Sequence, residues 1–153
     1  MSRVYLGYEK YGLEGVDSEY VQFIFDVVVS MVGLDEDAEV GLVITDNDQM
    51  HKLNKKYRGK DKPTNVLSFG YAETKDEVEI PNEDKHYIGD VYMSYTLVTE
   101  EAEEMKISVK QRFAQLFVHG LLHLAGIHHD SDKDADRMEA MEDEILGQIG
   151  AAE

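Results

Sequence analysis

The sequence lacks cysteine altogether, and its 153 residues contain no long apolar run. Without cysteine the chain forms no disulfide, although this absence does not identify a compartment. The longest charge-free apolar stretch in the first predicted helix, Val27 to Leu34, is far shorter than the roughly 20 residues that a bilayer span needs. The N-terminus also lacks the apolar core of a signal peptide. We therefore expect a protein that is neither membrane-spanning nor exported, and we expect it in the cytoplasm.

Basic residues are scarce as well, since 15 Lys and Arg stand against 32 Asp and Glu and the formal net charge is -17. This balance argues against a polyanionic partner, because nucleic-acid-binding proteins usually carry a basic footprint. Six of the basic residues, however, fall within residues 52–62 beside the single acid Asp61: Lys52, Lys55, Lys56, Arg58, Lys60 and Lys62. Two interpretations stay open. The segment is either a solvated helix face and turn or a local patch that contacts phosphate, because local potential rather than net charge steers a ligand into a cleft.

Histidines are concentrated in one segment, His119-Gly-Leu-Leu-His123-Leu-Ala-Gly126-Ile-His128-His129. His119 and His123 are four residues apart on a predicted helix, so both imidazoles lie on one face and can reach one metal ion. Gly126 can adopt the left-handed conformation that ends a helix, and this reversal would bring His129, or as second choice His128, toward the pair. Three histidine nitrogens with an open fourth position are typical of a catalytic zinc site.

A metal-free network of hydrogen-bonded histidines is the alternative, although burying two imidazoles without a partner costs free energy. The spacing is also close to the metzincin protease pattern H-E-x-x-H-x-x-G-x-x-H. Gly120 stands where those enzymes carry the glutamate that acts as general base. We therefore expect a similar metal cage but a different chemistry from peptide hydrolysis.

The hydrophobic periodicity predicts an α+β fold in one domain spanning 1–153, with a mixed sheet of about four strands packed with helices. Strands are predicted near 4–7, 38–45, 66–71 and 87–95, the last with Ile88, Val91, Met93 and Tyr95 facing inward. Helices are predicted over 17–32, 46–57, 97–105, 108–125 and 131–149, with N-caps at Asp46, Ser108 and Ser131. The polar, acidic residues 72–85 are predicted to form a loop.

The predicted helix over 108–125 has two unlike faces. At 100° per residue its polar residues form one narrow stripe of Arg112, Gln115, His119 and His123. Its apolar residues are Val109, Phe113, Leu116, Phe117 and Leu124.

Three motifs carry a resemblance to a known family. The histidine segment resembles H-G-x-L-H-L-x-G-x-D-H, residues 53–69 (LNKKYRGKDKPTNVLSF) resemble L-N-x-x-Y-R-x-x-D-x-x-T-D-V-L-S-F, and residues 88–94 (IGDVYMS) resemble L-G-D-I-x-I-S. In this order and spacing they resemble the YbeY family of bacterial metallo-endoribonucleases involved in ribosomal RNA maturation. Two positions differ: His128 and Asn65 each replace a usual aspartate. Asn65 keeps hydrogen bonding but loses a charge, which disfavours a role as base.

The resemblance implies that the histidine helix is central and largely buried, and that His119, His123 and His129 bind one metal ion, zinc by expectation. It implies that Arg58 is the catalytic arginine of a cleft. The neighbouring Lys55 and Lys56 are expected to help Arg58 bind substrate. The implied activity is single-strand-specific cleavage of RNA in small-subunit rRNA processing and ribosome quality control. The small ribosomal subunit or one of its proteins is the expected partner.

In the expected mechanism the zinc ion lowers the pKa of bound water toward about 7, and Arg58 holds a phosphate through two parallel hydrogen bonds. No general base emerges, and either an activated water or the RNA 2′-hydroxyl is the nucleophile. Two other functions stay open. One is a ribosome-assembly factor with a mainly structural metal, in which Arg58 forms a salt bridge to Asp61 or another nearby acid. The other is a zinc hydrolase of another substrate such as a peptide, against which Gly120 argues.

Overall fold

The structure is a computed structural model that describes residues 2–7, 12–74, 86–127 and 130–150. Its sheet has four strands in the order β1-β2-β4-β3, namely β1 (Arg3–Leu6), β2 (Glu39–Thr45), β4 (Tyr87–Ser94) and β3 (Val66–Gly70). β1, β2 and β4 run parallel, and β3 pairs antiparallel with β4. The predicted α+β class with a mixed four-stranded sheet is therefore confirmed. β3 is an edge strand, and this position matters for the site.

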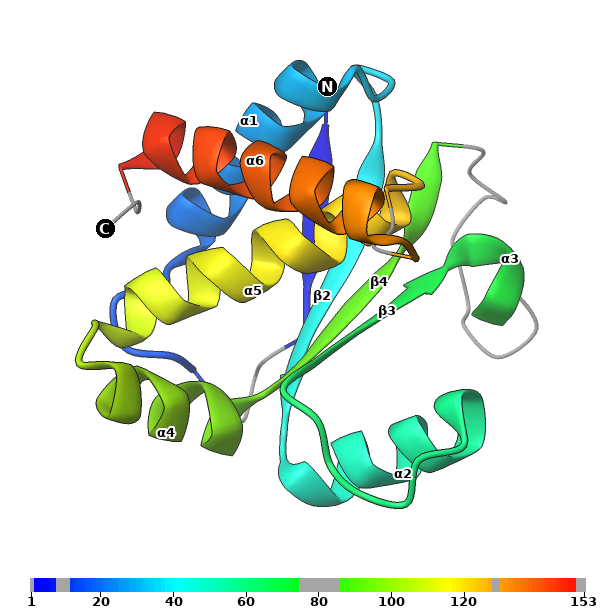
Figure 1. The fold of residues 1–153 in the computed structure, drawn as a ribbon, viewed down its shortest axis with the longest axis vertical. Coiled ribbons are helices and arrows are strands. Elements are labelled where there is room, and N and C mark those ends of the chain that lie inside the picture. The colour runs from blue at the N-terminus through cyan, green and yellow to red at the C-terminus, as the bar shows by residue number, and fades with distance from the viewer. Residues whose placement is uncertain (1, 8–11, 75–85, 128–129, 151–153) are drawn as a thin grey trace.

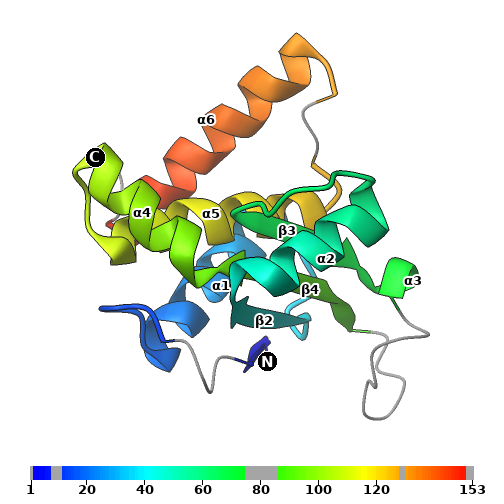
Figure 2. The ribbon, with the colours of Figure 1, turned by 90° about the horizontal axis from the view of Figure 1, so that it is seen from below.

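Six helices within the described ranges surround the sheet: α1 (Ser18–Val32), α2 (Asn47–Arg58), α3 (Tyr71–Thr74), α4 (Tyr95–Met105), α5 (Val109–Leu124) and α6 (Asp132–Ile149). Figure 1 shows α5 crossing the sheet, with α1 and α6 on the same side and α2 across β3 from it. In Figure 2, α6 lies outside α5, on the side away from the sheet. The expected central, largely buried position of the histidine helix is confirmed, because eight residues of α5 are buried, including Phe113, Phe117 and Leu121. None of the helices in the described ranges is long and apolar enough to cross a membrane.

Alternation along the strands gives the sheet two apolar faces. Val91 and Met93 of β4 belong to the main core, together with apolar residues of α1 and α5. Leu67 and Phe69 of β3 face the other way and pack with Met50 of α2 in a second, smaller cluster. The sheet therefore holds α5 on one face and α2 on the other, on either side of the β3 edge.

Local sequence explains where most helices begin. The side chains of Asp46, Ser108 and Ser131 each accept a hydrogen bond from the backbone N–H three residues on, which confirms the three predicted N-caps. Asp17 and Ser94 cap α1 and α4 in the same way.

Two predictions near the strand ends were wrong. Tyr95 does not face inward: it is 37% exposed and is the first residue of α4, because the Ser94 hydroxyl accepts from Leu97 N–H and begins a helix at this point. Likewise β3 ends at Gly70 rather than residue 71, and residues 71–74 form the short helix α3. Of the predicted loop, residues 75–85 lie outside the described residues.

Candidate metal centre and nucleic-acid cleft

A cleft of about 780 Å³ runs along β3, between α5 and the segment formed by α2 and α3. Figure 1 shows β3 lying between α5 and α2. The cleft brings together residues from three parts of the sequence. Its polar and charged lining residues are Asn54, Arg58, Lys60, Lys62, Thr64, Asn65, Ser68, Glu73, His119 and His123. Arg58 and the two helical histidines, predicted separately from sequence, therefore line the same cavity.

The histidine pair is positioned by the regular geometry of α5. His119 and His123 are both partly buried, and their Nε2 atoms are 3.2 Å apart. Two nitrogens bound to one zinc ion at about 2.0–2.1 Å in tetrahedral geometry are roughly 3.3 Å apart. The pair thus fits two ligands of a single ion.

A carboxylate contacts His119 through the ring nitrogen that does not face His123. The Nδ1 atom of His119 is 3.1 Å from Oε1 of Glu142, a residue of α6. An ionised carboxylate only accepts hydrogen bonds, so this contact requires a proton on Nδ1, and a neutral His119 then has its lone pair on Nε2, the nitrogen that faces His123. Glu142 could not be identified from the sequence alone, because it lies on another helix, 23 residues away from His119.

The chain turns directly after this pair. Gly126 has φ 87°, and its N–H donates to the carbonyl of His123 at 3.0 Å, while Ile127 N–H donates to the carbonyl of Leu122 at 2.9 Å. The predicted left-handed glycine at the end of the helix is confirmed. His128 and His129, the candidates for the third ligand, lie outside the described residues. Within the described ranges, no group of three potential ligands forms, and His129 stays a predicted ligand.

Gly120, at the position of the metzincin glutamate, lies against the sheet. A Cβ at this position would lie 3.1 Å from Cγ1 and 3.3 Å from Cγ2 of Val91 on β4. The missing side chain therefore lets α5 pack closely on the sheet. A side chain at this position would require Val91 to shift by a few tenths of an ångström, and residue 120 has no carboxylate that could act as the general base of the metzincin pattern.

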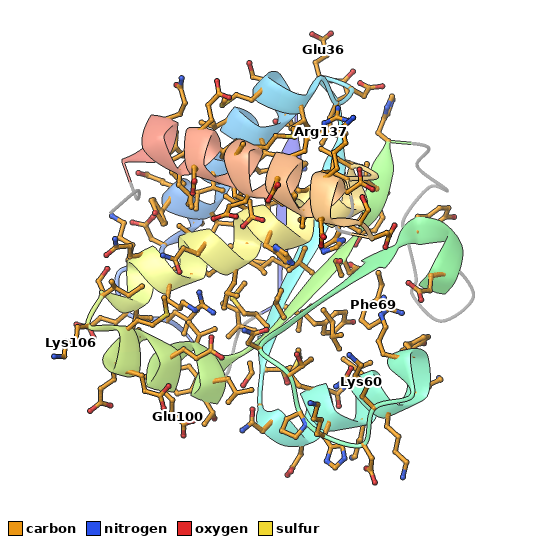
Figure 3. The ribbon with its side chains drawn as sticks, in the orientation of Figure 1. Glu36, Lys60, Phe69, Glu100, Lys106 and Arg137 are labelled. Atoms are coloured by element: carbon orange, nitrogen blue, oxygen red, sulfur yellow. The ribbon has the colours of Figure 1, made fainter. Side chains whose placement is uncertain are left out.

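Arg58 lies at the end of α2, on the wall of the cleft that faces the histidines. Its Nη1 is 2.6 Å and its Nη2 3.3 Å from the two carboxylate oxygens of Glu73, and Nη2 also donates to the carbonyl of Ser68 at 2.8 Å. The guanidinium carbon stacks 4.8 Å from the ring centre of Phe69; Figure 3 shows Phe69 between β3 and α2. The Ser68 carbonyl and the Phe69 ring thus hold the guanidinium in place. The two Nη atoms that would bind a phosphate already contact the Glu73 carboxylate. The predicted salt-bridge alternative for Arg58 is realised with Glu73, not with Asp61.

The basic segment divides into two parts at the end of α2. Asn54 is buried, and its side-chain amide donates to the carbonyl of Lys62 at 2.9 Å, which fixes the turn over residues 60–62 at the rim of the cleft. Lys60 and Lys62 line the cleft, whereas Lys55 and Lys56 project from the exposed face of α2 outside this lining. Figure 3 shows Lys60 beside α2. Three basic residues and one acid, Glu73, line the cleft of a chain whose net charge is -17.

Lys55 has an acidic neighbour on this outer face. Its Nζ lies 3.8 Å from Asp61, whose carboxylate also binds Nε2 of His51 at 2.6 Å. The hydrogen bond from His51 and the charge of Lys55 together hold the pKa of Asp61 below its ordinary value. Part of the positive charge on α2 is therefore offset locally by Asp61.

The polar stripe predicted on α5 continues beyond the histidines. Arg112 donates to Gln115 at 2.7 Å and to Glu101 of α4 at 2.8 and 3.0 Å. Glu101 also accepts from the side chain of Asn65, which lines the cleft. Asn65 is thus tied to a carboxylate as a hydrogen-bond donor, a role that an aspartate could not fill when ionised.

The fold and the cleft define an α+β protein with a histidine pair and an arginine facing one cavity. Residues 13–150 match the family described as Endoribonuclease YbeY. The chain belongs to this family, and the resemblance inferred from the three motifs is confirmed.

Relatives agree over most of the chain. An Endoribonuclease YbeY of Acinetobacter baumannii is 43% identical over 130 residues, covering 84% of this chain and 81% of the relative. That of Dichelobacter nodosus is 37% identical, covering 85% and 80%. The solution structure of TM1509 from Thermotoga maritima aligns with a TM-score of 0.56 at 26% identity, covering 97% of this chain and 91% of that one.

Proposed function

We propose that this protein is a metal-dependent endoribonuclease, formed by a single domain over 1–153, that cleaves single-stranded RNA in the cytoplasm during small-subunit rRNA maturation and ribosome quality control. The observation that carries the proposal is the shared cleft: Arg58, His119 and His123 line one cavity in a member of the Endoribonuclease YbeY family. A cavity that combines histidines able to bind a metal ion with an arginine able to bind phosphate suits phosphodiester hydrolysis.

His119, His123 and His129 would hold the ion, for which zinc suits an all-imidazole ligand set. The 3.2 Å separation of the two Nε2 atoms supports this fit. When bound, such an ion supplies Lewis-acid polarisation of a phosphoryl oxygen and lowers the pKa of water. His119 and His123 contribute neutral nitrogens, so the charge of the ion stays available to an anionic substrate.

Arg58 would hold the scissile phosphate. Its fork already binds a carboxylate through both Nη atoms, and a phosphate offers the same bidentate geometry with more negative charge. A substrate phosphate would therefore have to displace the Glu73 carboxylate from the Arg58 guanidinium. Ser68 and Phe69 keep contacts with the guanidinium that do not involve Glu73, so the arginine stays oriented during this exchange.

Lys60 and Lys62, on the rim, would contact neighbouring phosphates without reading sequence. The strongly acidic remainder of the chain repels the backbone of any nucleic acid that extends beyond the cleft. A flexible single strand can thread a narrow cleft, while a rigid duplex must also approach the acidic surroundings. Site selection on rRNA then depends on a partner, for which we propose the small ribosomal subunit or one of its proteins.

The test is cleavage of one labelled RNA oligonucleotide offered either single-stranded or annealed to its complement, using protein loaded with one equivalent of zinc. We expect internal cleavage of the single strand and much slower cleavage of the duplex. Full zinc occupancy with no cleavage of either RNA would instead support a ribosome-assembly factor. The ion pair between Arg58 and Glu73 is the feature that favours this second candidate.

A further inference from the structure

Glu142 occupies an unusual place for a charged residue. α6 packs on the core through buried residues at helical spacing, Met138, Ile145 and Ile149, and Glu142 lies in the same stripe, four residues after Met138 and three before Ile145. Its side chain is only 23% exposed. A partly buried carboxylate among packed apolar side chains lowers the stability of the fold unless it is paired. The described partner of Glu142 is His119, so the function of this contact is the question.

The contact with His119 joins the ring nitrogen that faces away from the candidate metal position. Glu142 accepts from Nδ1, and this leaves Nε2 directed at Nε2 of His123, 3.2 Å away. An imidazole that rotated, or that carried its proton on Nε2, could not present this lone pair to an ion. Histidines that bind metals commonly donate their other N–H to a carboxylate in this way.

We propose that Glu142 is a positioning residue of the metal centre, which holds His119 in the Nδ1-protonated tautomer with Nε2 aimed at the ion. This inference rests on the metal site of the proposed function. It assigns to the acidic C-terminal helix a role in metal binding, and it gives a function to the carboxylate that lies between buried apolar residues of α6.

The experiment compares Glu142→Gln with a matched control, Glu144→Gln. Both remove one negative charge from α6, but Glu144 is exposed and two residues away, on a different face of the helix. Zinc affinity is measured by competition with a chromophoric chelator. The tautomer of His119 is read in the zinc-free proteins by long-range nitrogen–proton NMR correlation. We expect Glu142→Gln to bind zinc about 10–100-fold more weakly and to lose its bias toward the Nδ1-protonated tautomer, while Glu144→Gln matches the parent.

Equal zinc affinities of the two variants would overturn the inference, even if Glu142→Gln melted at a lower temperature, because that pattern describes a merely structural ion pair. A parent protein whose His119 is protonated on Nε2 would also overturn it. Should Glu142→Gln fail to fold, Glu142→Asp takes its place, with the shorter side chain expected to weaken zinc binding in the same direction. A parent that binds no zinc would instead remove the metal site of the proposed function itself, which separates the two failures.

Discussion

The two walls of the cleft each pair a nitrogen-bearing side chain with a carboxylate, yet the two pairs have opposite consequences. On the α5 wall, Glu142 binds the far nitrogen of His119 and leaves the near nitrogen directed at the neighbouring imidazole. On the α2 wall, Glu73 binds both Nη atoms of Arg58, the same atoms that would take a phosphate. In the proposed function the first carboxylate would support metal binding by its partner, and the second would compete with substrate. The two ion pairs differ in which atom of the partner the carboxylate contacts, and this difference is why we propose opposite roles for them.

The largest effect is expected on the histidine wall. His123→Ala should lower the zinc content well below one per chain and abolish RNA cleavage, because one of the three proposed ligands is lost. Zinc is measured by elemental analysis of the purified protein. His51→Ala is the control, since this exposed imidazole binds Asp61 outside the cleft. Undiminished zinc in His123→Ala would contradict the ligand assignment.

On the opposite wall, Arg58→Ala should reduce cleavage by roughly 10²–10³-fold, as expected when a donor to a charged transition state is removed. Its ion pair with Glu73 is about one-third exposed on each side, so the loss of stability should stay near 1 kcal/mol, or a few degrees in melting temperature. Arg58→Lys should be nearly as inactive, because an ammonium cannot form the bidentate contact. Full activity per folded molecule combined with a large loss of stability would make Arg58 structural.

The split of the basic segment predicts a smaller, graded effect on binding. Lys60→Gln with Lys62→Gln should lower the slope of log affinity against log salt by roughly 1.4, at about 0.7 for each lost phosphate contact with a single strand. Lys55→Gln with Lys56→Gln should change it less, since these residues lie outside the lining of the cleft. Single-stranded RNA binding is measured at several salt concentrations. The opposite ranking would place the RNA on the exposed face of α2, where Lys55 and Lys56 lie.

The smallest expected effect is an increase in RNA affinity rather than a loss. Glu73→Gln removes the competing charge from Arg58, and an exposed ion pair of this kind contributes up to about 1 kcal/mol, so RNA affinity should rise by up to about fivefold. Fluorescence anisotropy at low salt measures this change. Glu100→Gln, on the exposed surface of α4, controls for the loss of one negative charge. Weaker RNA binding by Glu73→Gln alone would show that Glu73 orients Arg58 instead of competing with substrate.

Sequence reasoning succeeded where the geometry is local. The spacing of His119 and His123 and the conformation of Gly126 follow from helix periodicity and glycine stereochemistry, and the structure shows both. The N-caps and the order of the long helices were predictable for the same reason.

Contacts between distant elements were not predictable from one sequence. Glu142 reaches His119 only because α6 packs across α5, and nothing in the acidic C-terminal segment distinguishes this glutamate from its neighbours. The four-residue helix α3, which carries Glu73 to Arg58, is too short to show a periodic pattern. The division between the lysines on α2 and those on the turn depends on where the helix ends, at Arg58.

In the proposed function the histidines of α5 hold a metal on which RNA cleavage depends. The most direct measurement removes the metal with a chelator and follows both circular dichroism and cleavage of single-stranded RNA, before and after adding one equivalent of zinc. We predict that the stripped protein stays folded, loses cleavage, and recovers it with zinc, while His119→Ala does not recover. Cleavage that persists in the folded, metal-free protein would contradict a metal-dependent mechanism.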